Sequence, residues 1–295
     1  MKNLIRTLLK IVVSIVLLYL VFTTLNTENF LGTLRRLNLG YLLIAFILVL
    51  LSKYIAHKRL LFLFSKIDIQ IKASDHWKLY LQGMFYNLFL PGGIGGDAYK
   101  GYTIQKFAQV PIKRIIGCMV VDRLSGMYGL ALYFLAFITL SLENYRSLLS
   151  LDLPVWAGVL TTTLIAVIGT ALGYVILRTL FPYLLKGIER SVYRSIVLQG
   201  LQIVAAYLLL LGLGLQSNTF DYLTLFTVSS IVSVLPITMG GIGAREITFY
   251  YGADLLQINS DGAVALSIAF FIVNALVSLI GIYFHYKKPT LRKPD

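Results

Sequence analysis

Two copies of one glycine-rich run interrupt this otherwise apolar chain. The first copy is NLFLPGGIGGDAYK at Asn87–Lys100, and the second is VLPITMGGIGARE at Val234–Glu246. Both contain Leu-Pro, then Gly-Gly-Ile-Gly, and then a carboxylate, Asp97 or Glu246, that opens a new helix. Proline and glycine are the residues that a helix interior tolerates least. We therefore predict a break in the helical structure at each copy.

The composition indicates the environment of these breaks. Of the 295 residues, 58% are hydrophobic and only 13% are charged, which leaves too little charge to cover a soluble domain of this length. The chain is therefore predicted to be a polytopic membrane protein. Lys2, Arg6 and Lys10 resemble the start of a signal peptide, but Ile11–Leu25 lacks a small-residue cleavage site, so we expect a retained span.

Apolar runs of about 20 residues, enough to cross ~30 Å of hydrocarbon, divide the chain. Full spans are expected at about 8–25, 39–57, 115–140, 155–177, 196–215 and 263–285. The glycine-rich runs fall in two further apolar segments, 79–106 and 222–255. The first of these is too short for two straight spans and a turn, whereas the second could almost hold two short spans.

The net charge of +13 is carried by the connections between apolar runs. This distribution is typical of cytoplasmic loops at an anionic leaflet and argues against nucleic-acid binding. With the N-terminus in the cytoplasm, the basic connections 53–78 and 178–194 and the basic C-terminal tail all fall on the cytoplasmic side. We therefore predict a multi-pass protein of the cell membrane with both termini in the cytoplasm.

Flanking charges orient the two glycine-rich segments. Lys78 and Lys106 flank the first segment, which should enter from the cytoplasm and return there. Asp221 and Asp254 flank the second, which should enter from the opposite side. The predicted fold is all-α, with six full transmembrane helices and two re-entrant broken-helix hairpins.

The order span, span, hairpin, span occurs twice in a single membrane domain, 1–295. Residues 1–140 form the first repeat and 155–288 form the second, in opposite orientation. Inverted repeats with broken helices that meet near the bilayer midplane are typical of transporters.

Glycine-rich backbone at membrane depth must be covered by protein or line a wet cavity, because lipid cannot pair its polar groups. A helix that restarts there presents unpaired N–H groups and the positive end of its dipole, which suits an anion such as phosphate. Asp97 and Glu246 fit two roles equally well, as helix caps or as substrate contacts. The residues predicted to bind substrate are these glycines and the polar residues near them: Asn87, Gly92, Gly93, Gly95, Gly96, Asp97, Lys100, Asp122, Arg123, Gly240, Gly241, Gly243, Arg245 and Glu246.

Arginines within apolar segments are costly and mark a binding site or a paired network. Arg123 lies early in a predicted span, and Arg245 lies at the tip of the second hairpin. Because arginine grips phosphate with two parallel hydrogen bonds, the two favour an anionic head group. Structural pairing with Asp97, Asp122 or Glu246 is the competing interpretation.

Further polar residues flank the breaks or lie within the spans. Asn87 opens the first glycine-rich run, and Lys100 follows Asp97 by one helical turn. Lys100 could contact the substrate or extend to the interface. Gln199 and Asn274 could line a path or join helices by hydrogen bonds.

These motifs resemble the transmembrane module of lysylphosphatidylglycerol synthases, a flippase-like domain also found as stand-alone membrane proteins. The resemblance rests on Asn87–Lys100, Asp122–Leu124 and Leu235–Glu246, and it covers about residues 5–288. It implies a lipid flippase that moves a modified phospholipid or a polyprenyl-phosphate-linked lipid between leaflets. Asp122 stands where the family leads us to expect glutamate.

Three functions fit the sequence: a lipid transporter, which we favour, a membrane-embedded lipid-modifying enzyme, and a non-catalytic partner of a separate lipid synthase or glycosyltransferase. The chain stops at Asp295 without room for a synthase domain, so we expect no transferase activity. The scattered histidines and the lone Cys118 predict neither a metal site nor a cofactor. Membrane lipids are the expected partners, and the lipid and the oligomeric state stay open.

Overall fold

The computed structural model describes residues 27–89, 95–141, 154–234 and 243–294, together with isolated positions between 12 and 25. Throughout these residues the secondary structure is helical, with turns between the helices and no strand. The predicted first span, 8–25, falls largely outside the described residues. A short helix, α2 (Thr27–Arg35), follows it.

Five described helices are long and apolar enough to cross a membrane, which confirms the prediction of an all-α polytopic membrane protein. The last of them continues, after a short interruption, into a C-terminal helix, α13 (Ile282–Tyr286). The five are α3 (Leu39–Ser65), α6 (Ile112–Leu140), α8 (Val155–Leu180), α9 (Ile188–Gly212) and α12 (Ser260–Leu279).

Two of these helices are longer than the sequence led us to expect. Helix α3 runs on to Ser65 instead of ending near residue 57, and α9 begins at Ile188 instead of residue 196. The cause is burial of polar residues that were read as the membrane interface. His57 and Arg59 of α3, for example, are covered by neighbouring helices.

Helices end and restart on either side of each glycine-rich run, as predicted. Helix α4 (Ala73–Phe89) packs against α5 (Gly95–Ala108), and α10 (Thr219–Val234) packs against α11 (Ala244–Leu255). The connections 90–94 and 235–242 lie outside the described residues. The re-entrant path of each pair through the membrane stays a prediction.

Gly96 shows why the first pair requires glycine. A Cβ atom at this position would lie 1.8 Å from the carbonyl oxygen of Gly83 on α4. The two backbones can approach this closely only because neither helix carries a side chain there. The Gly96 N–H also donates to Oδ1 of Asn87 over 2.8 Å, which fixes the start of α5 against the end of α4.

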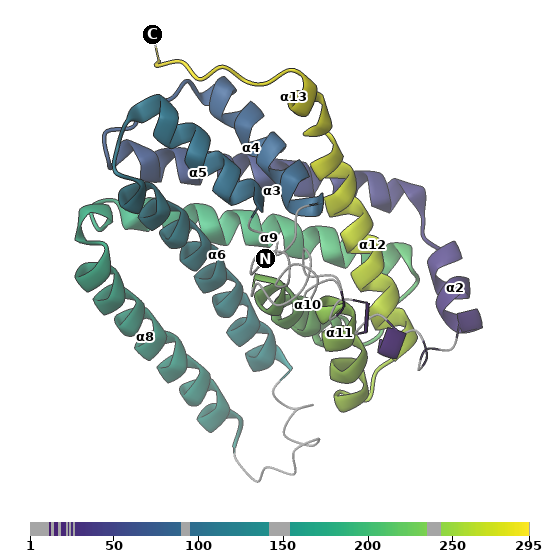
Figure 1. Cartoon of the computed structure of the whole chain (residues 1–295). Helices are drawn as coiled ribbons and strands as arrows, with labels where there is room; N and C mark the ends of the chain where they lie inside the picture. Colours follow the sequence, from purple (N-terminus) through teal and green to yellow (C-terminus); the bar gives the residue numbers. More distant parts are fainter. Residues whose placement is uncertain are drawn as a thin grey trace.

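The helices pack in two corresponding sets. Helices α3 and α9, the second full span of each predicted repeat, make the most extensive contact among the described helices (Figure 1). Helix α3 also packs against α4, α6 and α12, and α9 packs correspondingly against α10, α12 and α6. The α5–α6 contact likewise corresponds to the α11–α12 contact. An internal repeat predicts that each contact in one set of helices has a counterpart in the other set. The boundaries of the repeats and their inversion stay predictions.

Helix α8 lies at the edge of the molecule, where it packs against α6 and the short 3-10 helix η2 (Pro182–Leu184) (Figure 1). None of the described side chains of α8 is buried. Hydrogen bonds between Thr139 and Thr162 and between Tyr128 and Thr170 join it to α6. In a membrane protein, such an exposed apolar helix faces lipid.

Candidate functional site

A pocket of about 400 Å³ lies where the two broken helix pairs meet α3, α6, α9 and α12. Each of these elements contributes at least one side chain to its wall. Its apolar wall includes Met84, Leu88, Met127, Leu130 and Phe271. Its polar lining residues are Lys53, Arg59, Tyr80, Asn87, Asp97, Lys100, Asp122, Arg123, Gln199, Ser233, Arg245, Asn274 and Ser278.

The pocket brings together many of the residues that the sequence singled out, including the alternatives Gln199 and Asn274. Gly95, Gly96, Gly243 and Glu246 lie close by in sequence but do not line it. Gly92, Gly93, Gly240 and Gly241 fall outside the described residues. The predicted site residues that line the pocket are Asn87, Asp97, Lys100, Asp122, Arg123 and Arg245.

Asp97, in the first turn of α5, is paired with two cations. Its Oδ1 lies 2.6 Å from Nζ of Lys100, and its Oδ2 accepts hydrogen bonds from Nε of Arg123 over 3.0 Å and from Nη2 of the same side chain. The Arg123–Asp97 pair that the sequence raised as a structural alternative is therefore present. The side chain of Arg123 nevertheless keeps 33% of its surface exposed and lines the pocket.

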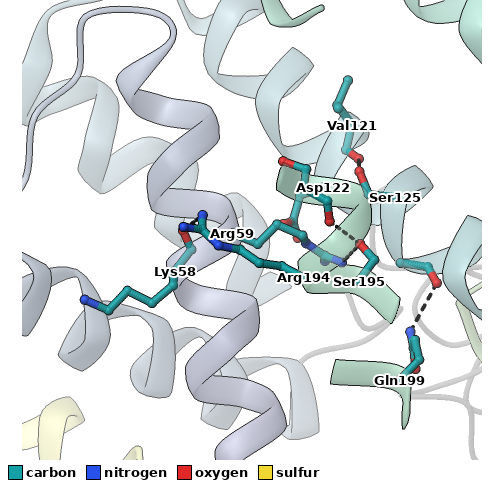
Figure 2. Close-up of polar contacts among 10 residues, drawn as sticks. Lys58, Arg59, Val121, Asp122, Ser125, Arg194, Ser195 and Gln199 are labelled. Atoms are coloured by element: carbon teal, nitrogen blue, oxygen red, sulfur yellow. Dashed lines mark hydrogen bonds and ion pairs between the residues drawn. The ribbon is translucent and has the colours of Figure 1, made fainter. Parts of the chain in front are cut away.

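Asp122 joins α6 to α3 and α9 through Arg59 (Figure 2). Nε of Arg59 donates to Oδ1 of Asp122 over 2.7 Å, and its Nη1 donates to Oγ of Ser195 over 2.7 Å. One turn further along α9, Gln199 donates to the carbonyl of Gly126 on α6 (Figure 2). This network of paired groups forms one wall of the pocket.

Arg59 and Lys53 are site residues that the sequence reading missed, because both belong to a basic cluster that was assigned to the membrane interface. A periodicity signal was available: Val49, Ser52, Ala56 and Arg59 recur every three or four residues and are all buried on one face of α3. Lys53 lies beside that face and is only partly exposed. Lys53 lines the same pocket as Arg59 and Arg245.

Arg245 occupies the first turn of α11 and is only 8% exposed. Among the residues that the structure describes, its Nε and Nη2 atoms have no hydrogen-bond partner. Its guanidinium carbon lies 5.2 Å from the centroid of the Phe270 ring, a cation–π contact that offers no acceptor oxygen. A buried guanidinium with free donors facing a pocket is suited to bind an anion.

Glu246, directly after Arg245, faces away from the pocket. Its Oε2 accepts a hydrogen bond from the backbone N–H of Gly243 over 2.7 Å, and its Oε1 accepts one from Oγ of Ser267 over 2.9 Å. These bonds place Glu246 in the capping role at the start of α11. They leave Arg245 without a carboxylate partner.

The pocket carries a surplus of positive charge. Five cations face two carboxylates, which leaves a formal excess of 5 − 2 = 3 positive charges on the lining residues. The carboxylates are Asp97 and Asp122, and the cations are Lys53, Arg59, Lys100, Arg123 and Arg245. Within a low-dielectric environment such an excess favours an anionic ligand.

His57 and His76, far apart in the sequence, meet beside the pocket residue Tyr80. Their Nδ1 atoms lie 3.5 Å apart, and both side chains are fully buried. Among the described residues, no group of three or more potential metal ligands occurs. The rings of both histidines pack against that of Tyr80 where α3 meets α4.

Comparison with known proteins agrees with this architecture. The "UPF0104 membrane protein MJ1595" of Methanocaldococcus jannaschii is 23% identical over 129 residues, which are 43% of this chain and 38% of that protein. The match thus spans less than half the length of this relative. The profile described as "Lysylphosphatidylglycerol synthase TM region" matches residues 7–281, which include both broken helix pairs and every residue that lines the pocket. The chain therefore belongs to the family of lysylphosphatidylglycerol synthase transmembrane regions.

Proposed function

We propose that the protein binds the anionic head group of a membrane lipid in the pocket and moves the lipid between the two leaflets. The single observation that carries this proposal is the buried, unpartnered guanidinium of Arg245. Desolvating a cation without an acceptor lowers stability, so such a group within a membrane segment marks a ligand site by default. The family relationship to a lipid-related membrane module supports the same class of ligand.

The lining also suits a lipid that enters by its head. The lining combines charged residues, among them Arg245 and Asp97, with the apolar residues Met84, Leu88 and Phe271, which could contact the first carbons of the lipid chain. Both broken helix pairs contribute to the pocket, so a relative movement of the two halves would open it to one side or the other. Alternating exposure of one site is the mechanism that we propose for translocation.

Catalysis on the bound lipid is the weaker proposal. A general base or nucleophile must be free to react, but Asp97 and Asp122, the carboxylates in the described lining, are both ion-paired. A protein that only assists a separate lipid enzyme would not itself have to move lipid. We expect purified protein to move lipid and to leave its chemical structure unchanged.

A flip assay with the purified chain in proteoliposomes tests the proposal. Anionic phospholipids carrying a reporter in one leaflet should reach the other leaflet faster than in empty vesicles. Arg245→Ala and Arg123→Ala should reduce the rate to that of empty vesicles. Both variants should fold, because Nε and Nη2 of Arg245 have no hydrogen bond to a described residue to lose, and Asp97 keeps Lys100 when Arg123 is removed.

The matched control is Arg178→Ala, at the exposed end of α8 and away from the pocket. It removes an equal charge and should leave the rate unchanged. Transport that both pocket variants leave intact would contradict the site. Wild-type vesicles with no transport, or with chemically altered lipid, would favour the partner role or the enzyme.

A further inference from the structure

We propose that the pocket selects lipids whose head group ends in a doubly charged phosphate, either a phosphomonoester or a pyrophosphate, and discriminates against head groups that carry an ammonium. The inference rests on the proposed lipid-head-group site. The inference specifies the charge of the head group. It is derived from which charged side chains of the pocket are already paired with one another.

The carboxylates of the described lining are already paired. Both oxygens of Asp97 are engaged, one by Lys100 and one by Arg123. Asp122 holds Arg59, which is itself buried. An ammonium that entered the pocket would meet no uncommitted carboxylate among the described residues and would be repelled by the surplus cations. Because bringing like charges together inside a protein costs free energy, a cationic head group is disfavoured.

Two cations remain without an acceptor, and they come from opposite halves of the molecule. Lys53 of α3 makes no ion pair or hydrogen bond to any described residue, and the same holds for Nε and Nη2 of Arg245 on α11. Both side chains line the same pocket, where two like charges in a low-dielectric environment repel each other. A single negative charge would balance one of them, whereas a phosphate dianion balances both.

The geometry of the donors also favours phosphate. The Nε and Nη2 atoms of an arginine lie on one edge of the guanidinium and can bind two phosphate oxygens side by side. The phosphomonoester keeps three terminal oxygens for such contacts, whereas a phosphodiester keeps two. Arg123, which is only partly covered by Asp97, is positioned to add a contact to a third oxygen.

The size of the pocket limits the head group. Its volume of about 400 Å³ lies near the lower end of the ~300–1,000 Å³ that is usual for ligand pockets. The apolar residues Met84, Leu88 and Phe271 occupy part of the wall, so part of the space is left to the lipid chain. A phosphate group together with the first carbons of a lipid chain fits within this volume.

Binding to nanodiscs that contain the full-length protein tests the inference. Phosphatidic acid, phosphatidylglycerol and lysylphosphatidylglycerol with identical acyl chains are titrated into a phosphatidylcholine background, and bound lipid is measured by native mass spectrometry. We expect phosphatidic acid to bind about tenfold more tightly than phosphatidylglycerol, equivalent to about 1.4 kcal/mol. Lysylphosphatidylglycerol should bind no better than phosphatidylcholine. Equal or tighter binding of either competitor would overturn the inference.

Variants and pH supply independent readouts. Lys53→Gln and Arg245→Gln should each reduce the preference for phosphatidic acid to about the level of phosphatidylglycerol, while Arg178→Gln should keep it. The second proton of a phosphomonoester dissociates with a pKa of about 6. The preference should therefore grow between pH 5 and pH 7.5, and a preference that is constant over this interval would contradict the role of the dianion.

Competition by a soluble anion distinguishes a phosphate carried by a lipid from a free phosphate. Inorganic pyrophosphate that displaces phosphatidic acid at a comparable concentration would support the phosphate chemistry but assign it to a free anion. Weak displacement would support a lipid-borne phosphate. The two proposals can fail separately. Flipping without a head-group preference would support transport and contradict the inference, whereas selective binding without flipping would support the inference and contradict transport.

Discussion

The cations that line the pocket differ in whether they are ion-paired with a carboxylate. Asp97 and Asp122 hold three of the five cations in fixed ion pairs, and these pairs join helices that are distant in sequence. Nε and Nη2 of Arg245 have no hydrogen-bond partner among the described residues, and Arg245 and Lys53 are the cations that we propose bind the ligand. The first group of contacts builds the pocket, and the second group gives it a binding capacity. Substitutions in the first group should therefore lower mainly the stability of the fold, whereas substitutions in the second group should weaken mainly the binding of the ligand.

Asp122→Asn should destabilise the protein by about 3 kcal/mol or more, because removal of one partner leaves the buried Arg59 charge uncompensated. The side chain of Arg59 is only 6% exposed, so water cannot replace the lost carboxylate. Thermal unfolding of the purified protein in detergent measures the effect. Lys78→Gln is the control: it removes a half-exposed partner of Asp75, at 3.4 Å, and should cost less than ~1 kcal/mol. Equal losses in both variants would contradict the structural role of Asp122.

The sequence could predict the residues whose chemistry is conspicuous in an apolar setting. Arg123, Arg245 and the residues flanking the glycine-rich runs were found in this way, and the Arg123–Asp97 pair was among the predicted alternatives. Arg59 and Lys53 were missed, because a basic cluster at the end of an apolar run has the same composition whether it faces lipid head groups or the protein interior. Only the packing of α3 against α6 and α9 decides between the two environments.

At the scale of helices, the close approach of α4 and α5 is what places Asp97 and Lys100 in the pocket. Gly96→Ala should force these helices apart, because its Cβ would lie 1.8 Å from the backbone oxygen of Gly83, an atom that cannot rotate away. Overpacking of this kind costs about 1–3 kcal/mol or more. We expect a lower unfolding temperature together with weaker lipid binding.

Gly169→Ala on α8 is the matched control for this prediction. A Cβ at Gly169 would meet nothing within 4 Å, and alanine is the better helix former by about 1 kcal/mol. The variant should therefore unfold at the same or a higher temperature. Unfolding of Gly96→Ala at the wild-type temperature would show that the α4–α5 contact adjusts and would remove the requirement for glycine.

Helix boundaries could be predicted where proline and glycine residues in the chain itself determine them. Predicted and observed boundaries differ where packing against other helices determines them. The breaks at the two glycine-rich runs follow from proline and glycine, and the helices end at Phe89 and Val234 on the near side of each run. The end of α3 was placed eight residues early, since residue 57 was predicted and Ser65 is found. The end of a transmembrane helix is set by its neighbours as much as by hydropathy, because buried polar residues extend the helix beyond its apolar run.

At the scale of the whole molecule, the corresponding packing of α3–α6 and α9–α12 places the pocket where the two sets of helices meet. The motif that recurs about half a chain length apart led us to predict an inverted repeat, and the boundaries and the inversion of that repeat stay predictions. The sequence could not predict that α3 and α9 would make the central contact, because apolar faces of transmembrane helices carry little information about their partners.

The C-terminal tail ties the end of the chain back to the first half. Nε and Nη2 of Arg292 donate to the two oxygens of Asp75 over 2.8 and 3.1 Å, and the backbone N–H of Lys72 donates to the carbonyl of Arg292 over 2.8 Å. The hydrogen bond from Arg292 lowers the pKa of Asp75 below its ordinary value. A carboxylate whose pKa is lower in the folded state contributes stability above its unfolded pKa and loses it as the pH falls through the folded pKa.

The tail should therefore stay docked at neutral pH and detach only in acid, below the ordinary pKa of an aspartate. A spin label on Lys293→Cys reports docking as restricted motion, and the native Cys118 is buried and should not react. Asp75→Asn should release the label at every pH, because the neutral amide cannot hold both donors of Arg292 as an ionised carboxylate does. Lys287→Gln keeps the Asp75–Arg292 pair and serves as the control. Release of the wild-type label between pH 5 and pH 7 would contradict the lowered pKa of Asp75. A label that stays restricted in acid and in Asp75→Asn would assign the docking to the backbone bond from Lys72 instead.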